Sequence, residues 1–379
     1  MLEKINHFFK TFFSLENPHI QMGIKTYRRF EHFAPPISFV AGFSYDSMTL
    51  TRIDRLSDNL VLLGYLLMLG LTILAYHLVE MNVLKYPPLV NNRHWIPVAI
   101  QFFLGGLFSA YVIFYFQSVS FTKGAFFLVI LLVLLIANEI FHHRLTNIYL
   151  QIGLFFLAVF SFLTFFIPVV VKDIATPWFL LGGILSLGAV AGVLYLLYRY
   201  SAVKSSEQLV RLGAMVGGLY LMLNIFYFMN WIPPIPLSVR HAGVYHEVHR
   251  TEAGFEVAYQ KQPWYAIWRQ SDKVFEHTPA DTVWCMAAVF APTELRTRIY
   301  HHWQFFDDRK ESWTTTDRIR YPIVGGRDGG YRGVTFKKNV AEGKWRVTVE
   351  TEDTRVLGRV DFEIRAVDSL SLPLVRGIR

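Results

Sequence analysis

The chain has 379 residues, of which 53% are hydrophobic and only 17% are Asp, Glu, Lys or Arg. Soluble domains carry about 25% charged residues, so this composition excludes an ordinary soluble globular protein. The formal net charge is +8, yet the 22 basic residues from Ser238 onward are mixed with 19 acidic residues. Such a mixture is typical of a solvated surface, and it argues against a nucleic-acid partner.

The N-terminal 34 residues are predicted to form a cytoplasmic segment. Residues 1–29 lack the charged, apolar and small-residue pattern of a signal peptide, so the hydrophobic segments themselves are expected to drive membrane insertion. An apolar stretch follows at residues 35–50, but it is short and contains Asp46. It is compatible with a tilted or re-entrant span, an interfacial helix or a packed helix that precedes the bundle.

Asp46 is the one carboxylate well inside this apolar stretch. An ionisable side chain at membrane depth is a functional hypothesis by default, and Arg52 or Arg55 is its expected partner. The alternative is that Asp46 is solvated or caps a helix. These three residues are therefore the candidates for an intramembrane polar site.

Six later stretches are apolar and long enough to cross about 30 Å of hydrocarbon, which needs about 20 residues. They are predicted as spans at residues 60–79, 95–116, 122–141, 148–171, 177–198 and 209–232. The helical bundle is thus expected to occupy residues 35–236. At the end of the third span, Glu139, His142 and His143 share a helix face, which we interpret as a polar cap at the membrane interface, because the other helices offer no matching half of a metal site.

The positions of basic residues favour seven crossings, with the N-terminus in the cytoplasm and the C-terminal domain outside. The outer short loops then hold only Arg52, Arg55, Lys123 and Lys172. The cytoplasmic side holds Lys4, Lys10, Lys25, Arg28, Arg29, Lys85, Arg93, Arg144, Arg199, Lys204 and Arg211. Six crossings would either export the basic N-terminal tail or place the loop 199–211, which is rich in basic residues, outside.

After Pro233, Pro234 and Pro236, which cannot continue a helix, the hydrophobic period changes to two. Residues 237–379 are therefore predicted to form an all-β domain of the immunoglobulin-like sandwich type. A hairpin is expected from 241–250 and 255–261. The other strands are expected at 264–269, 282–291, 295–306, 313–324, 331–340, 344–351 and 356–367.

The loop of residues 325–333 contains five glycines and presents Arg327, Asp328, Tyr331 and Arg332 between two strands. Its arginines and tyrosine are suited to bind an anion or a glycan. The alternative is a structural turn, in which glycines supply unusual backbone angles. It is not a phosphate-binding loop, because it lacks the GxxxxGK[ST] order and no helix follows.

His301 is predicted to point into the core with Ile299 and Trp303, as a histidine that packs and does not bind metal. The single cysteine, Cys285, lies in an apolar run and is expected to be a small buried hydrophobic residue. No Ser-His-Asp or Cys-His arrangement can be assembled. We therefore predict no catalytic residues, no metal and no cofactor.

Five C-terminal segments resemble a bacterial family known as domain of unknown function 2914. These segments are 289–293, 299–303, 325–333, 343–347 and 356–362, and residues 42–46 and 50–54 resemble the membrane region of longer members. The resemblance implies a small β domain that is often attached to a membrane and faces the cell envelope. Its motif positions here are His301, Trp303, Tyr331, Arg332 and Trp345, with a role in the fold or in ligand binding.

Two functional hypotheses follow. In the first, a non-enzymatic protein of the bacterial inner membrane presents a periplasmic β domain that binds an envelope glycan, a lipid headgroup or a partner protein. The ligand candidates are Arg327, Asp328, Tyr331, Arg332, His301 and Trp303. In the alternative, a membrane-embedded enzyme or transporter acts on a lipid or glycan carrier near Asp46, Arg52 and Arg55. The shortage of charge in the bundle argues against this alternative.

Overall fold

The computed structural model describes most of the chain in segments. They are residues 43–44, 46–48, 50, 55–118, 125–140, 146–200, 202–203, 205–233, 236–252, 254–261, 271–279, 281–291, 295–324 and 330–379. The chain divides into two compact units, residues 1–51 and residues 52–379. Most of the predicted segment 35–50 lies outside the described residues, so its crossing of the membrane stays a prediction.

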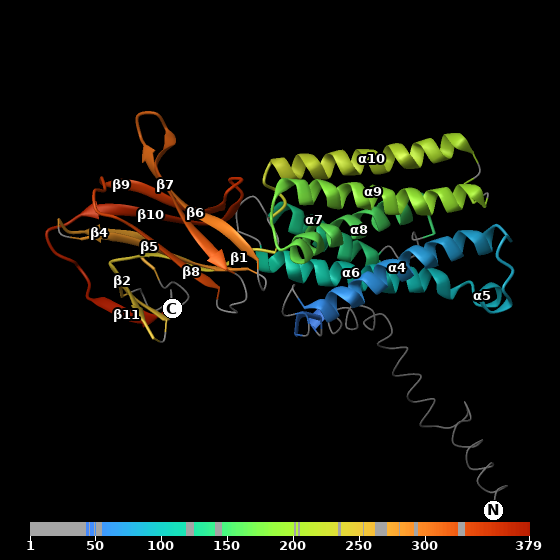
Figure 1. Cartoon of the computed structure of the whole chain (residues 1–379), viewed down its shortest axis with the longest axis horizontal. Coiled ribbons are helices and arrows are strands. Elements are labelled where there is room, and N and C mark those ends of the chain that lie inside the picture. Colours follow the sequence, from blue (N-terminus) through green and yellow to red (C-terminus); the bar gives the residue numbers. More distant parts are fainter. Residues whose placement is uncertain are drawn as a thin grey trace, which may run out of the picture. The chain divides into compact units, whose positions relative to one another are not determined.

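A helical region precedes an all-β domain, as predicted (Figure 1). Among the described residues, five helices are long and apolar enough to span a membrane. These are α4 (Leu56–Glu80), α6 (Trp95–Ser118), α8 (Ile148–Val171), α9 (Thr176–Arg199) and α10 (Ser206–Phe228). A short helix, α5 (Pro87–Asn91), connects α4 to α6.

The third predicted span, at residues 122–141, appears as the shorter helix α7 (Ala125–Ile140). Its 16 residues rise about 24 Å at about 1.5 Å per residue, which is less than the hydrocarbon thickness of about 30 Å. The residues on both sides of α7, 119–124 and 141–145, lie outside the described residues. The sixth crossing is therefore a proposal, whereas five described helices have the length and composition that a span requires.

Helix α8 is the centre of the bundle. Of its most apolar stretch 67% is buried, against 22% for α10, so α8 is surrounded by protein and α10 presents most of its surface outward. The side chain of Asn147 caps α8 by accepting the backbone N–H of Tyr149 at 2.8 Å. Buried polar side chains form hydrogen bonds from one helix to another, as in the 2.7 Å contact between His77 Nε2 of α4 and Gln151 Oε1 of α8. Such pairing is needed because the bilayer core offers no water.

The described residues of the β domain form three sheets. The first has the order β1-β5-β8, the second β4-β10-β9-β6-β7, and the third β11-β3-β2. The strands are β1 (Ser238–Tyr245), β2 (Glu247–Thr251), β3 (Gly254–Gln260), β4 (Val274–His277), β5 (Val283–Phe290), β6 (Arg296–Asp307), β7 (Ser312–Val324), β8 (Tyr331–Lys337), β9 (Gly343–Thr351), β10 (Val356–Ala366) and β11 (Leu374–Ile378).

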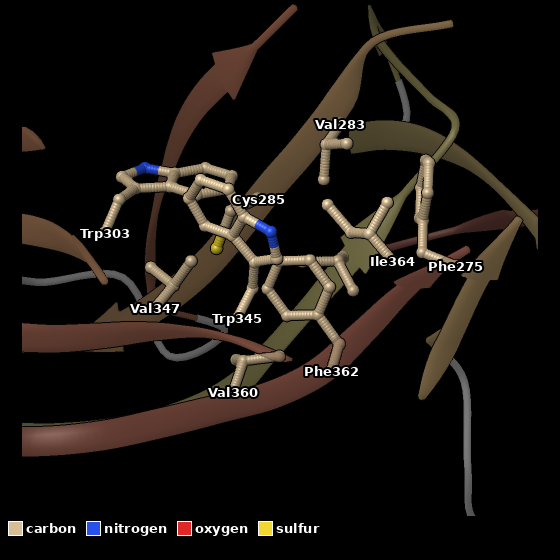
Figure 2. Close-up of a cluster of buried hydrophobic side chains, with 10 residues drawn as sticks. Phe275, Val283, Cys285, Trp303, Trp345, Val347, Val360, Phe362 and Ile364 are labelled. Carbon is tan, nitrogen blue, oxygen red and sulfur yellow. The ribbon is translucent and has the colours of Figure 1, made fainter. Parts of the chain in front are cut away.

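The first two sheets pack face to face around one apolar core. Cys285 of β5 meets Trp303 of β6, Trp345 and Val347 of β9 and Phe362 of β10 in this core (Figure 2). Buried positions alternate with more exposed ones in the second half of β10 and in the first half of β9, as the sequence period predicts, but β9 is buried on both faces from Val347 to Thr351. These two sheets thus form a sandwich, and the third sheet is additional to it.

Three features of the β domain concern the sequence predictions directly. The predicted hairpin is confirmed as β2 and β3, which pair in antiparallel register through Thr251 and Gly254, but its predicted first strand, 241–250, is divided between β1 and β2. The predicted strand 264–269 lies outside the described residues. Two strands were not predicted: β4, which pairs parallel with β10, and β11, which extends the β2–β3 sheet.

Arg355, in the turn between β9 and β10, links the β domain to the end of α10. Its guanidinium lies over the ring of Tyr227 and donates to the carbonyl oxygen of the same residue at 3.2 Å. Only 6% of Arg355 is exposed, and this burial lowers the pKa of its guanidinium to about 10. The buried cation is held by its aromatic and carbonyl partner, which is the compensation a buried charge requires.

Candidate ligand-binding face of the β domain

The outward face of the second sheet, formed by β7, β6, β9 and β10, is rich in cations. The strand registers place alternate residues of these strands on one face. Its described acidic residues are Glu350, Asp361 and Glu363, and Glu352, directly after β9, binds Arg298 at 3.1 Å. Its described basic residues are Arg298, Arg318, Arg320, Lys344, Arg346, Arg359 and Arg365. We call this surface the arginine face.

Arg318 is the most firmly held cation of the arginine face. Its Nε donates to Glu350 Oε1 at 2.8 Å, and its guanidinium lies 4.0 Å from the ring centre of Tyr300. His302 contacts the other Glu350 oxygen at 3.3 Å through Nδ1 and Thr315 Oγ1 at 2.7 Å through Nε2. Because the Glu350 side chain is only 5% exposed, this network holds a buried carboxylate and orients the surrounding strands.

Arg346 and Arg359 form the second part of the arginine face. Arg346 lies 4.1 Å from the ring centre of Trp313 and binds Asp361 at 2.5 Å. Arg359 pairs with Thr348 across the β9–β10 ladder, and its Nε has no hydrogen-bond partner among the described residues. Partial burial, followed by the nearby Arg346 charge, lowers the pKa of the Arg359 guanidinium. Because the guanidinium groups of Arg346 and Arg359 repel each other, an anion that binds beside them is favoured.

The chemistry of this surface is that of anion recognition. Guanidinium groups bind carboxylates and phosphates through two parallel hydrogen bonds, and stacking on aromatic rings holds the guanidinium planes in place. Tyr300 and Trp313 provide these rings, and Phe306 packs edge-on against Trp313 at 5.2 Å. The arginine face thus offers the side chains that anion recognition requires.

Two of the sequence-predicted ligand residues, His301 and Trp303, are each 0% exposed. His301 Nδ1 lies 2.9 Å from Thr335 Oγ1, and Trp303 Nε1 donates to the same oxygen at 3.1 Å. The Tyr321 hydroxyl lies 3.0 Å from His301 Nε2. Burial lowers the pKa of His301 to about 3. In this structure both side chains join the two sheets in the core and present no atom at the surface.

The glycine-rich loop is only partly described. Arg327 and Asp328 lie outside the described residues, so their role stays a prediction. Tyr331 and Arg332 are the first residues of β8, in the sheet opposite to the arginine face, where they pair with Val289 and Ala288. The structure therefore does not bring these predicted residues together with the arginine face.

Gly333 has a packing role that we test by substitution. A Cβ at Gly333 would lie 2.1 Å from two atoms of the Tyr321 ring. The hydroxyl of this tyrosine is hydrogen-bonded to His301. Gly333→Ala is therefore expected to lower the free energy of unfolding of the β domain by about 1–3 kcal/mol through overpacking.

The measurement for Gly333→Ala is the labelling rate of Cys285, which is fully buried in the core. Faster labelling in the full-length variant reports more frequent opening of the domain. Gly377→Ala is the matched control, because its Cβ would meet its nearest neighbours at 3.6 Å or more. Equal labelling rates in both variants would contradict the packing role.

Most of the proposed intramembrane polar site lies outside the described residues. Asp46 is half-buried in a helical segment, and its carbonyl oxygen accepts the Leu50 N–H at 2.8 Å. Arg52 lies outside the described residues, and Arg55 is exposed directly before α4. His142 and His143 also lie outside. Among the described residues, no group of three His, Cys, Asp or Glu side chains could hold a metal ion.

Sequence analysis did not single out the arginine face, although part of its signal is visible. Arg298, Tyr300 and His302 alternate with buried residues along one predicted strand, as do Arg346 and Glu350 along another. Period-two alternation says that such residues point outward. The alternation does not say which strands are neighbours in the sheet. The cations form one surface only because β7, β6, β9 and β10 are neighbours.

Comparison with known proteins gives one family match. Residues 296–364, which run from β6 into β10 and carry all of the arginine face except Arg365, match the family described as "Protein of unknown function (DUF2914)". This confirms the resemblance of the C-terminal domain. No curated protein matches the chain.

Matches to solved structures are weak. A β-glucosidase from Listeria innocua, in complex with gluconolactone, is 10% identical with a TM-score of 0.18, over 29% of this chain and 16% of its own. The alkylpurine DNA glycosylase AlkC of Pseudomonas fluorescens, bound to DNA containing an abasic site analogue, is 11% identical with a TM-score of 0.21, over 75% and 83%. At these scores neither likeness bears on fold or function.

Proposed function

We propose that this chain is a non-enzymatic, multi-pass protein of the bacterial inner membrane whose periplasmic β domain binds an acidic glycan of the envelope. The observation that carries the proposal is the arginine face, where stacked guanidinium groups lie on a rigid sheet. The apolar helices support attachment to a membrane, because such surfaces are expelled from water. Only nine residues, 229–237, separate α10 from β1, so the β domain stays near the bilayer.

The topology in this proposal has six spans from α4 to α10, if α7 crosses with its flanking residues, and the weaker segment 35–50 as a seventh. Alternate crossings put the start of α4, the α6–α7 and α8–α9 connections and the β domain on one side. The basic loops 81–94 and 200–205 then lie on the other side, which the positive-inside rule makes cytoplasmic. We retain the immunoglobulin-like assignment of the sandwich as part of this proposal.

Sidedness is tested with a reporter. Alkaline phosphatase fused after Arg379 is expected to be active in intact cells, because this enzyme needs the oxidising side of the inner membrane. The same enzyme inserted in the loop at Asn91–Asn92 is expected to be inactive. A reversed pattern of activity would contradict the proposed orientation.

Glycan binding is tested with the double variant Arg346→Ala/Arg359→Ala. Each charge-assisted hydrogen bond contributes about 1.5–3 kcal/mol, so affinity for polygalacturonate is expected to fall at least about tenfold per lost contact. Arg318 is left in place, because its removal would leave the buried Glu350 carboxylate without its cation. The matched control is Arg376→Ala, which removes a side chain 61% exposed from β11 in another sheet.

The binding assay uses the full-length chain in detergent, with immobilised polygalacturonate as the acidic glycan, dextran as the neutral glycan and polyglutamate as the acidic peptide. Salt-sensitive binding to polygalacturonate that is lost only in the double variant supports the proposal. Equal binding by both variants, or none by the wild type, would overturn it. Stronger binding to polyglutamate than to polygalacturonate would also overturn it, in favour of an acidic protein partner.

A further inference from the structure

A large apolar groove lies in the helical bundle. It is formed by other residues than the arginine face, and its lining is apolar where the arginine face is charged. Its volume is about 650 Å³, within the range of about 300–1,000 Å³ that is typical of small-molecule sites. Helix α8 forms its floor and α7 and α10 form its walls. The lining residues are Leu134, Ala137, Asn138, Asn147, Tyr149, Leu150, Gly153, Leu154, Leu157, Met215 and Leu219.

The length of the groove corresponds to one leaflet of a bilayer. Along α8 it runs from Asn147 to Leu157, a rise of about 15 Å at about 1.5 Å per residue. This is half of the hydrocarbon thickness of about 30 Å. Because α8 begins at Ile148, the groove occupies the half of the membrane where that helix starts. Leu150 is 37% exposed, so the groove opens to the outside of the bundle.

One end of the groove is polar and the rest is apolar. Asn147 and Tyr149 lie where α8 begins, and Asn138 lies near the end of α7. Asn138 is 6% exposed, and its Nδ2 donates to the Gln101 carbonyl oxygen at 3.1 Å. Its Oδ1 has no hydrogen-bond partner within the described part of the chain. A buried acceptor without a partner is costly in a bilayer, so it favours a ligand that brings a donor.

The size of the groove distinguishes between possible occupants. A helix with its side chains is about 10–12 Å wide and rises about 5.4 Å per turn, so 650 Å³ holds little more than one turn. A second copy of the chain or another helix would therefore leave most of its length outside. A single extended hydrocarbon chain is narrow enough to lie in the groove along its full length. The apolar lining and the polar end match the two parts of a lipid.

We propose that the groove between α7, α8 and α10 binds one hydrocarbon chain of a membrane phospholipid, whose head region donates a hydrogen bond to Asn138. The lipid comes from the leaflet opposite to the β domain, because α8 starts on the side from which α10 also starts. This site is independent of glycan binding by the arginine face.

The test is native mass spectrometry of the full-length chain, washed with detergent that removes loosely held lipid. The wild type is expected to retain one phospholipid per chain, and Gly153→Leu is expected to reduce its occupancy at least tenfold. A Cβ at Gly153 would touch Met215 and Leu219 at 3.6 and 3.7 Å, so a larger side chain must enter the groove. Gly188→Leu is the matched control, because Gly188 of α9 faces open space and this variant should keep the lipid.

Two further measurements complete the experiment. Gly153→Ala, which makes only ordinary contacts, should melt like the wild type and shows whether the position tolerates a side chain. A phospholipid with a photoactivatable acyl chain should crosslink the wild type on α7, α8 or α10, whether or not Gly153→Leu folds. Crosslinks confined to α9, full lipid occupancy in folded Gly153→Leu, a wild type without retained lipid, or a dimer that Gly153→Leu dissociates would each overturn the proposal.

Discussion

Replacing Trp303 by alanine is expected to lower the free energy of unfolding of the β domain by about 3–5 kcal/mol. Trp303 is 0% exposed and lies between the two sheets, where it shares the core with Cys285 and Phe362 (Figure 2). Its Nε1 also donates to Thr335 at 3.1 Å. The substitution leaves a large cavity and removes a partner from a buried hydroxyl, and both effects destabilise.

Cys285 makes this effect measurable in the intact membrane protein. It is the single cysteine of the chain and is 0% exposed, so a thiol reagent reaches it only when the β domain opens. A loss of 3–5 kcal/mol should raise the labelling rate by about two to four orders of magnitude, at about 1.4 kcal/mol per tenfold change. Trp313→Ala, on the arginine face, should change stability by about 1 kcal/mol or less. Equal effects of both variants would contradict the core role of Trp303.

The sandwich core was predictable because its signal is local. Trp345, Val347 and Val349 are two residues apart on β9, and all three are buried as the alternation predicts. The buried His301 was predicted for the same reason, since it shares the face of Ile299 and Trp303. Apolar length likewise identified five helices as candidate spans.

Features that depend on contacts between distant segments were not predictable. Strand β4 has only four residues and owes its position to parallel pairing with β10, about 90 residues later in the chain. The arginine face combines Tyr300, Arg318 and Glu350 from three strands, and no local pattern specifies their register. The groove in the bundle is equally hidden, because apolar residues that line it look like those that fill a core.

The pH dependence of stability follows from the buried His301. In the folded domain burial lowers its pKa from 6.5 to about 3, so the native state does not take up a proton above that pH. The unfolded chain takes it up below about pH 6.5. Between these values the unfolded state binds one proton more than the native state, so stability increases with pH by about 1.4 kcal/mol per unit. The contribution is fully present above pH 6.5 and is lost on acidification.

Asp272 works in the opposite direction. Burial raises the pKa of its carboxyl to about 7, and the side chain lies 3.6 Å from Nε2 of His246. Between pH 3.8 and about 7 the native state then binds more protons than the unfolded state at this position, so its contribution to stability falls as pH rises. Because the two groups oppose each other, the pH profile of the wild type alone does not reveal either one.

His301→Gln isolates the histidine, because glutamine keeps a donor and an acceptor but does not titrate. The wild type's advantage in free energy of unfolding over this variant is expected to shrink by about 2–3 kcal/mol between pH 6.5 and 4.5. Above pH 6.5 the difference should be constant. Cys285 labelling of the full-length proteins with 4,4′-dithiodipyridine, which reacts with thiols in acid, measures both free energies. The Asp272 contribution is common to both proteins and cancels in the difference. A difference that stays constant down to pH 4.5 would mean that native His301 takes up a proton, and the His301–Thr335–Tyr321 network would then have to open in acid.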